Sequence, residues 1–287
     1  MLKAPTRPPR PFPPGLPRRA AADLLLRHDG SVLLGAAGLQ PDRWQRRLLL
    51  RRSHRALVLT SRQVGKSTTV AARALQRAMT QALCTVICVA PTERQSMEII
   101  TKVRRLIAAQ PTLGKIPNNA ATKVTLPNGS RIIALPGKPD TIRGYSADLL
   151  ILDEAAFLSD DVYEVATPMT AATSGDIIAL TTANGKSGWF YEAWSGENDD
   201  GDEWDRTLVP YHDVSRITEE FIRGEKGRMS AARFRAEYLC DFISAAGAVW
   251  NADMIARIVA QGETQTPDSG ALPDFAEWKR AREAVHA

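Results

Sequence analysis

The sequence RALVLTSRQVGKST at residues 55–68 combines a short apolar run with a loop that contains Gly65-Lys66-Ser67. Residues 55–60 have the length and composition of a buried strand, and the alanine-rich stretch 66–81 indicates a helix. The spacing is that of a P-loop (Walker A), although Thr60 stands where the first glycine usually lies. This order of strand, loop and helix predicts a phosphate-binding site at the start of the helix.

The loop supplies most of the residues that we expect to bind ATP. Glycine allows the backbone to approach a phosphate closely, and the amides that open the helix point at its negative charge. Lys66 is expected to neutralise the β- and γ-phosphates, and Ser67 to ligand Mg²⁺. The alternative is an ordinary strand–turn–helix corner. The predicted nucleotide-binding residues of the loop are Ser61, Arg62, Gln63, Gly65, Lys66, Ser67 and Thr68.

A second apolar run, residues 148–152, ends in the consecutive carboxylates Asp153 and Glu154. Adjacent residues of a strand point in opposite directions, so the two carboxylates can have different roles. We expect Asp153 to hold Mg²⁺, as a Walker B aspartate does, and Glu154 to orient and deprotonate the attacking water. The alternative is a charged pair that caps a following helix.

The remaining pattern indicates the fold class. Nearly continuous apolar strands that alternate with helices are typical of a parallel sheet covered on both faces. We therefore expect an α/β fold. Further strands are expected at 84–90, 176–182 and 203–209, and a hairpin with an Asn-Gly turn at 123–135. Further helices are expected at 41–52, 92–110, 188–194, 218–226 and 230–240.

Taken in order, these motifs resemble the terminase large subunits, the DNA-packaging motors of tailed bacteriophages. That family typically replaces the first glycine of its P-loop and carries arginine inside it, as SRQVGKS does here. The resemblance covers residues 41–242. It also includes Trp44-Gln45, the segment 90–95, Ile142-Arg143-Gly144 before the second strand, and residues 181–194. It implies a RecA/ASCE-like P-loop ATPase.

The resemblance also assigns roles to residues outside the two central motifs. Gln45 would bind adenine, since an amide can pair with one donor and one acceptor of the base edge; the alternative is a solvated helix residue. Arg62 would sense the γ-phosphate or form an ion pair with one of the two carboxylates. Arg143 would be an arginine finger that acts on a neighbouring subunit, or else a DNA-binding or surface arginine. Thr182 and Asn184 would couple hydrolysis to the helix that follows.

The implied function is an ATP-hydrolysing motor that translocates double-stranded DNA into a procapsid. Its implied partners are DNA, a portal protein that carries a homo-oligomeric ring of these subunits, and a small terminase subunit. The implied location is the cytoplasm of the bacterial host. The alternatives are a helicase-like DNA-dependent ATPase and a decayed prophage remnant that binds DNA without moving it.

Composition limits the choice of function. The net charge of +5 is uneven: residues 1–55 hold twelve basic and three acidic residues, a net charge of +9, and the remainder carries −4. A basic balance suggests a nucleic-acid partner, although part of this charge could serve nucleotide phosphates. No apolar run reaches about 18 residues, so we expect no membrane span. The four histidines lack metal-ligand spacing, and three cysteines are too few for a disulfide scaffold.

Three regions are expected along the chain. Residues 1–20 are rich in proline and arginine and predict a disordered tail. Residues 21–242 would form the ATPase domain, and residues 243–287 a linker and a short helix at 275–285. The resembled family usually continues into a ribonuclease-H-like nuclease, a fold that needs acidic residues on several strands. The last 45 residues offer no apolar strands to carry them, so we expect no nuclease activity in this chain.

Overall fold

The structure is a computed structural model of the 287-residue chain, and it describes residues 24–50, 53–110, 113, 116, 120–196 and 204–243. The predicted tail at 1–20 and the predicted helix at 275–285 lie outside these residues. Among the described helices, none is both long and apolar enough to cross a membrane.

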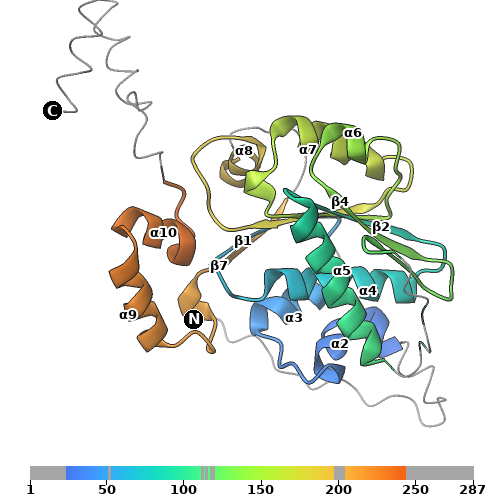
Figure 1. Cartoon of the computed structure of the whole chain (residues 1–287), viewed down its shortest axis with the longest axis horizontal. Helices are drawn as coiled ribbons and strands as arrows, with labels where there is room; N and C mark the ends of the chain where they lie inside the picture. The colour runs from blue at the N-terminus through green and yellow to red at the C-terminus, as the bar shows by residue number, and fades with distance from the viewer. Residues whose placement is uncertain are drawn as a thin grey trace, which may run out of the picture. The chain divides into compact units, whose positions relative to one another are not determined.

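A seven-stranded sheet forms the centre of the fold, with the strand order β3-β4-β2-β5-β6-β1-β7 (Figure 1). All neighbouring strands are parallel except the hairpin of β3 and β4. This confirms the predicted α/β fold with a mostly parallel sheet. The strands are β1 (Arg55–Thr60), β2 (Thr85–Ala90), β3 (Lys123–Thr125), β4 (Arg131–Pro136), β5 (Leu149–Asp153), β6 (Asp176–Thr181) and β7 (Asp205–Val209).

Helices cover both faces of the sheet. In Figure 1, α2 to α5 lie on one face, and α6, α7 and α8 lie on the other. The α-helices are α2 (Ser31–Ala36), α3 (Arg43–Leu50), α4 (Lys66–Thr80), α5 (Glu93–Ala108), α6 (Pro139–Ile142), α7 (Asp160–Ala166), α8 (Trp189–Ser195), α9 (Glu219–Arg228) and α10 (Ala231–Leu239).

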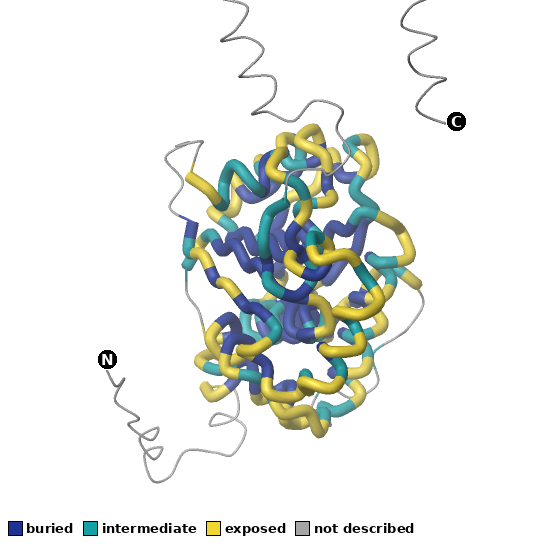
Figure 2. The backbone as a smooth tube through the Cα atoms, turned by 90° about the vertical axis from the view of Figure 1, so that its left-hand side faces the viewer, coloured by how far each residue is buried: buried dark blue, intermediate teal, exposed yellow. Residues whose placement is uncertain are grey.

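Each buried strand contributes to two hydrophobic cores. In β1, Val58 packs with the core beneath α4 and α5, whereas Leu57 and Leu59 pack with the core beneath α7 and α8. Alternation along a strand sends successive side chains to opposite faces, so a strand covered on both sides must be apolar throughout. Figure 2 shows the result as buried strands inside a shell of exposed loops and helix surfaces. Cys84 and Cys88 are buried in this core.

The short helices α2, α6 and α7 were not predicted, whereas the short α8 was. The sequence gives no strong helical period for α2, which is six residues long and contains Gly35, or for the seven-residue α7. The hairpin is as predicted, and Gly129 occupies its turn with a φ of +81°. The rest of the predicted strands and helices between 41 and 240 lie within a few residues of their expected bounds.

The strand order decides which loops meet. β6 lies between β1 and β5, so the carboxyl ends of these three parallel strands lie side by side. The loops after them begin at Ser61, Glu154 and Thr182. In open parallel sheets ligands bind outside the carboxyl ends of the strands, and the predicted site residues converge there.

Candidate nucleotide-binding site

The P-loop adopts a conformation that requires glycine at its last turn. Gly65 has a φ of +88° and immediately precedes the first residue of α4. A Cβ atom at this position would lie 3.0 Å from Nε2 of Gln45, in addition to the strain of the left-handed backbone. Thr69 N–H donates to the Gly65 carbonyl at 3.0 Å and starts the helix. The loop therefore presents the first amides of α4 to a ligand, as an anion site requires.

Distant parts of the chain hold the loop in place. Ser61 N–H donates to the Val209 carbonyl at the end of β7, and Arg62 N–H donates to the Glu237 carbonyl in α10, both at 2.8 Å. Arg216 donates to the Val64 carbonyl at 2.5 Å. The loop is thus tied at three points to residues more than 140 positions away.

Lys66 and Glu154 form the central ion pair of the site. Lys66 Nζ lies 3.3 Å from Glu154 Oε1, and the lysine is buried. Glu154 has a left-handed backbone with a φ of +51°, and its Oε2 atom is buried without a hydrogen-bond partner. Glu154 occupies the N-cap position of the 3-10 helix that follows, η2 (Ala155–Phe157), but its side chain makes no capping bond.

Asp153 lies at the end of β5 and is only 4% exposed. Burial, and then the neighbouring Glu154 carboxylate, raise the pKa of Asp153 to about 6, while Lys66 partly offsets the rise. Glu154 N–H donates to Asp153 Oδ1 at 3.1 Å. A buried carboxylate beside a second carboxylate favours a bound cation or proton.

A cleft of about 580 Å³ opens in front of these groups, a typical size for a ligand pocket. Residues 62–67 of the loop line it, with Glu154 and Thr182. Ser61, Thr68 and Asp153 do not line it; Ser61 and Asp153 are buried behind the loop. Outside the loop, five lining residues were not predicted from sequence: Pro91, Gln95, Lys102, Phe157 and Glu237. Of these five, Pro91 and Gln95 fall within the segment 90–95 that was noted in the sequence.

Arg62 is half-exposed in the cleft and pairs with Glu237, with Nη1 3.5 Å from Oε1. The alternative from the sequence, that Arg62 pairs with Asp153 or Glu154, is wrong. Arg62 is nevertheless beside the phosphate-binding amides, where a role toward the γ-phosphate stays a prediction.

Gln45 is buried in α3, next to the P-loop helix. Its Nε2 donates to Thr69 Oγ1 and its Oε1 accepts from Asp42 N–H, both at 2.8 Å. The alternative of a solvated helix residue is therefore wrong. Gln45 does not line the cleft, and its amide keeps one donor and one acceptor position for another partner. Contact with adenine stays a prediction.

Arg143 follows α6, beyond the end of β4, and is exposed. It does not line the cleft. Within the part of the chain that the structure describes, its guanidinium has no hydrogen bond or ion pair. The sequence prediction of a finger for another subunit is not tested by this position alone.

The end of β6 contacts the loop that carries Glu154. Thr181 Oγ1 accepts from Ala156 N–H at 3.3 Å, and Asn184 Nδ2 donates to the Ala156 carbonyl at 3.0 Å. Thr182 itself faces the cleft. Both predicted coupling residues are therefore adjacent to the central ion pair, and Thr181, which was not predicted as a coupling residue, joins them.

This sheet order, loop and pair of carboxylates define a P-loop nucleotide-binding domain. Residues 57–257 match the family described as terminase large subunit, T4likevirus-type, N-terminal. Because the match covers more than half of the sequence, the chain belongs to this family.

Individual relatives agree with this assignment. The terminase large subunit of Thermus phage G20c is 24% identical over 248 residues, which are 75% of this chain and 51% of that protein. The chain thus spans about half the length of the curated relatives it matches.

Solved structures share the fold. The large terminase ATPase domain of Thermus phage P74-26 superposes with a TM-score of 0.61 at 22% identity, covering 73% of this chain and 97% of that one. The large terminase of another thermophilic bacteriophage, in complex with ADP, gives a TM-score of 0.60 at 12% identity, covering 71% of this chain and 54% of that one.

Proposed function

We propose that this chain is the ATP-hydrolysing motor domain of a phage DNA-packaging terminase and that it translocates double-stranded DNA into a procapsid. The observation that carries the proposal is the Lys66–Glu154 pair, at 3.3 Å, between the P-loop and the end of β5 in a chain of the terminase family. The same lysine and acid in one cleft are the minimum needed to bind a triphosphate and activate water.

The residues fit a magnesium–ATP complex. Mg²⁺ prefers oxygen ligands and is usually bound by one or two carboxylates together with substrate phosphates. Asp153 and Ser67 would provide the protein ligands, and the raised pKa of Asp153 indicates a carboxylate whose negative charge is not balanced by the protein alone. The metal would neutralise charge that develops on the phosphates. The large terminase of the thermophilic phage compared above has been solved with ADP and with ATP-gamma-S.

Three side chains would then have separate roles in hydrolysis. The phosphates of a bound triphosphate would compete with Glu154 for Lys66, so phosphate binding would draw the lysine toward the nucleotide and weaken its pair with the glutamate. Glu154 Oε2, which has no hydrogen-bond partner, is free to accept a proton from the attacking water. Arg62 would turn from Glu237 toward the γ-phosphate, since both lie in the same cleft.

Arg143 would act on the cleft of a neighbouring subunit. Its side chain does not line the cleft of its own subunit. An exposed arginine whose side chain has no partner among the described residues suits a finger supplied in trans, within a homo-oligomeric ring.

Coupling to movement would run through β6. The bonds from Thr181 and Asn184 to Ala156 link the loop of Glu154 to the segment before α8. A shift of Glu154 on hydrolysis would move this segment, with Thr182 in contact with the nucleotide.

The remaining parts of the proposal rest on the family. We propose double-stranded DNA, a portal protein and a small terminase subunit as partners, and the host cytoplasm as the location. We also propose residues 21–242 as the ATPase domain, with residues 1–20 and 243–287 outside it. Lys66, Asp153 and Glu154 are all in place, which does not favour a decayed remnant, and no described feature favours a helicase.

The proposed chemistry is tested by phosphate release from Glu154→Gln protein, with and without DNA. The variant keeps the size and hydrogen bonding of the side chain but cannot accept a proton. We expect ATP binding close to wild type and a loss of turnover of about 10²–10⁴-fold. Lys66→Ala, which should lose binding as well, is the comparison. Turnover at the wild-type rate in Glu154→Gln would disprove the assignment of the base.

The trans role of Arg143 is tested by mixing two inactive proteins. Arg143→Ala alone should lose about 10³–10⁵-fold in the turnover of assembled protein. When it is mixed with Lys66→Ala protein, the intact arginine of the second protein should serve the intact cleft of the first, and activity should partly return. Arg223→Gln, on the exposed face of α9, is the control. Absence of recovery in mixtures shown to co-assemble would contradict a trans finger.

A further inference from the structure

A second cavity, of about 270 Å³, lies at the amino-terminal edge of the sheet. It is formed where the helical residues 24–28, the end of α3 and the middle of α4 meet the start of β6. Its polar lining is mostly cationic. The charged and titratable residues that line it are Arg27, His28, His54, Arg73, Arg77 and Asp176.

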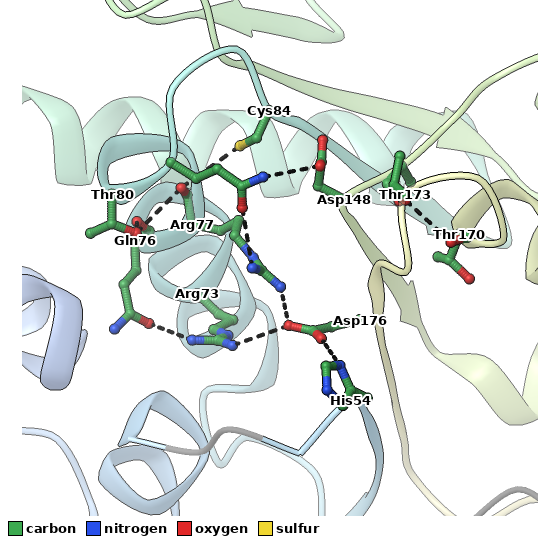
Figure 3. Close-up of polar contacts among 12 residues, drawn as sticks. His54, Arg73, Gln76, Arg77, Thr80, Cys84, Asp148, Thr170, Thr173 and Asp176 are labelled. Carbon is green, nitrogen blue, oxygen red and sulfur yellow. Dashed lines mark hydrogen bonds and ion pairs between the residues drawn. The ribbon is translucent and has the colours of Figure 1, made fainter.

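Two arginines of α4 share one aspartate in this cavity. Arg77 Nη2 donates to Asp176 Oδ2, and Arg73 Nη2 lies 3.8 Å from the same oxygen. His54 Nδ1 lies 2.8 Å from Oδ1. Figure 3 shows the three nitrogen-bearing groups gathered around the one carboxylate. Because Arg77 and His54 hold the close positions, Asp176 is already occupied as a counter-ion.

Arg73 is therefore a mostly buried cation whose one carboxylate contact among the described residues is the 3.8 Å ion pair with Asp176. Its side chain is 13% exposed, and its one close polar contact among the described residues is Nη1 to Gln76 Oε1, at 2.9 Å. Burial, and then the nearby Arg77, lower the pKa of Arg73, and Asp176 only partly restores it. Buried charges are normally paired, because the desolvation of an unpaired ion is costly.

Arg27 adds a third guanidinium to the cavity lining. It is exposed, and within the described residues it has no hydrogen bond or ion pair. With both histidines neutral, three arginines and one aspartate give the cavity a formal charge of +2. The planar donor fork of arginine matches the oxygens of a phosphate group.

We propose that this cavity binds a phosphate group, with Arg27 and Arg73 as its ligands and Asp176 holding Arg77 beside it. The phosphate would be either a phosphodiester of the DNA backbone or a free phosphate or pyrophosphate. The site is separate from the nucleotide cleft: Arg73 is seven residues along α4 from Lys66, about 10 Å of helix, and belongs to the opposite edge of the sheet. It does not depend on the proposed ATPase activity.

The site is tested in the Lys66→Ala background, which removes phosphate binding at the P-loop. Thermal unfolding is measured in increasing inorganic phosphate or pyrophosphate, with chloride adjusted to constant ionic strength. A ligand of the folded state shifts the unfolding equilibrium by a factor of 1 + [L]/Kd, about 100-fold at 100 Kd. We expect a rise in Tm with phosphate or pyrophosphate that follows the logarithm of 1 + [L]/Kd.

Arg27 is the residue to change, because it is exposed and its loss leaves the buried network intact. Arg27→Gln should weaken the apparent affinity at least fivefold, and Arg27→Glu should abolish the rise in Tm. Arg223→Gln, another exposed arginine without a partner among the described residues, should respond as the background does. Absence of a phosphate-dependent rise in Tm, or an equal rise in Arg27→Glu, would overturn the proposal.

Binding of duplex DNA across a salt series distinguishes the two sources of phosphate. If a phosphodiester occupies the site, Arg27→Gln should reduce the slope of log affinity against log salt by about one. If the slope is unchanged while the phosphate-dependent rise in Tm is lost, the site takes a free phosphate. Either result supports the cavity as a phosphate site.

Discussion

The neighbouring strands β5 and β6 each carry a buried aspartate, but at opposite ends and in opposite surroundings. Asp153 ends β5, is 4% exposed and adjoins the carboxylate of Glu154. Asp176 begins β6, is 9% exposed and is surrounded by Arg73, Arg77 and His54. The surroundings of the aspartate thus hold too little positive charge at one edge of the sheet and an excess of positive charge at the other.

The difference separates an acid used for binding from an acid used for structure. At the carboxyl edge the protein leaves negative charge under-compensated, which costs stability until a cation arrives. At the amino edge the aspartate joins α4 to β6 and holds two guanidinium groups together. Substitution by asparagine should therefore have opposite effects on the free energy of unfolding at the two positions.

The largest expected effect on stability is that of Asp176→Asn. Removing the carboxylate leaves the largely buried guanidinium groups of Arg73 and Arg77 without this counter-ion, and breaking a buried pair typically costs about 3–5 kcal/mol. Denaturant unfolding of the variant should show a loss of this order. Asp161→Asn, at an exposed position of α7, is the control and should be near neutral. An equally small loss of stability in both variants would contradict a structural role for Asp176.

Asp153→Asn should instead stabilise the protein, by an amount that grows from about pH 4 and is complete above pH 6. The folded state raises the pKa of Asp153 from 3.8 to about 6, so it favours the neutral acid. That contribution is fully present below about pH 4 and is lost as the pH rises through 6. At about 1.4 kcal/mol per pKa unit, the ionised carboxylate costs up to about 3 kcal/mol at pH 8.

Unfolding of wild type and Asp153→Asn at pH 4 and pH 8, without metal or nucleotide, measures this difference. The variant should be more stable at pH 8 and equal to wild type at pH 4. Magnesium-dependent ATP binding should be weaker in the variant. A variant that is less stable at pH 8 would show that Asp153 is compensated by its surroundings, and the contrast with Asp176 would fail.

The smallest expected effect is that of Glu237→Gln. Its pair with Arg62 is partly exposed, and such pairs contribute about 0–1 kcal/mol. Stability should hardly change, whereas ATP binding should tighten by up to about tenfold, because a negative charge leaves the phosphate cleft and Arg62 is released. Titration with ATP measures this, with Glu220→Gln on α9 as control. Weaker ATP binding would mean that Glu237 positions Arg62 for the nucleotide instead of competing with it.

The parts of the site that were predictable lie close together in the sequence. Residues 55–68 specify their own strand, loop and helix through apolar length, Gly65 and Lys66, and the apolar run before Asp153 does the same. The continuous apolar runs predicted a parallel sheet, because a strand buried on both faces has apolar side chains at every position instead of at every second one.

Contacts between distant residues were not predictable. Arg62 and Glu237 are 175 positions apart, and nothing in an ordinary amphipathic helix indicates that one of its glutamates enters a cleft. The burial of Gln45 depends on Thr69, which itself belongs to another helix. The cluster around Asp176 draws on β6, α4 and the residue before β1, and no spacing in the sequence brings these together.

The position of β1 in the sheet has a consequence for folding during synthesis. Its two neighbours come late in the chain: Arg55 pairs with Ile177, and Ala56 pairs with Asp205. At about 5–20 residues per second, the ribosome needs roughly 8–30 s to make the second neighbour after the P-loop strand has been made. Until β6 is made, both edges of β1 are open; until Val209 emerges, the edge that faces β7 stays open and Ser61 N–H lacks its acceptor. Nucleotide binding by a nascent chain should therefore begin only after β7 is complete, so that its onset would report when this last strand has been made.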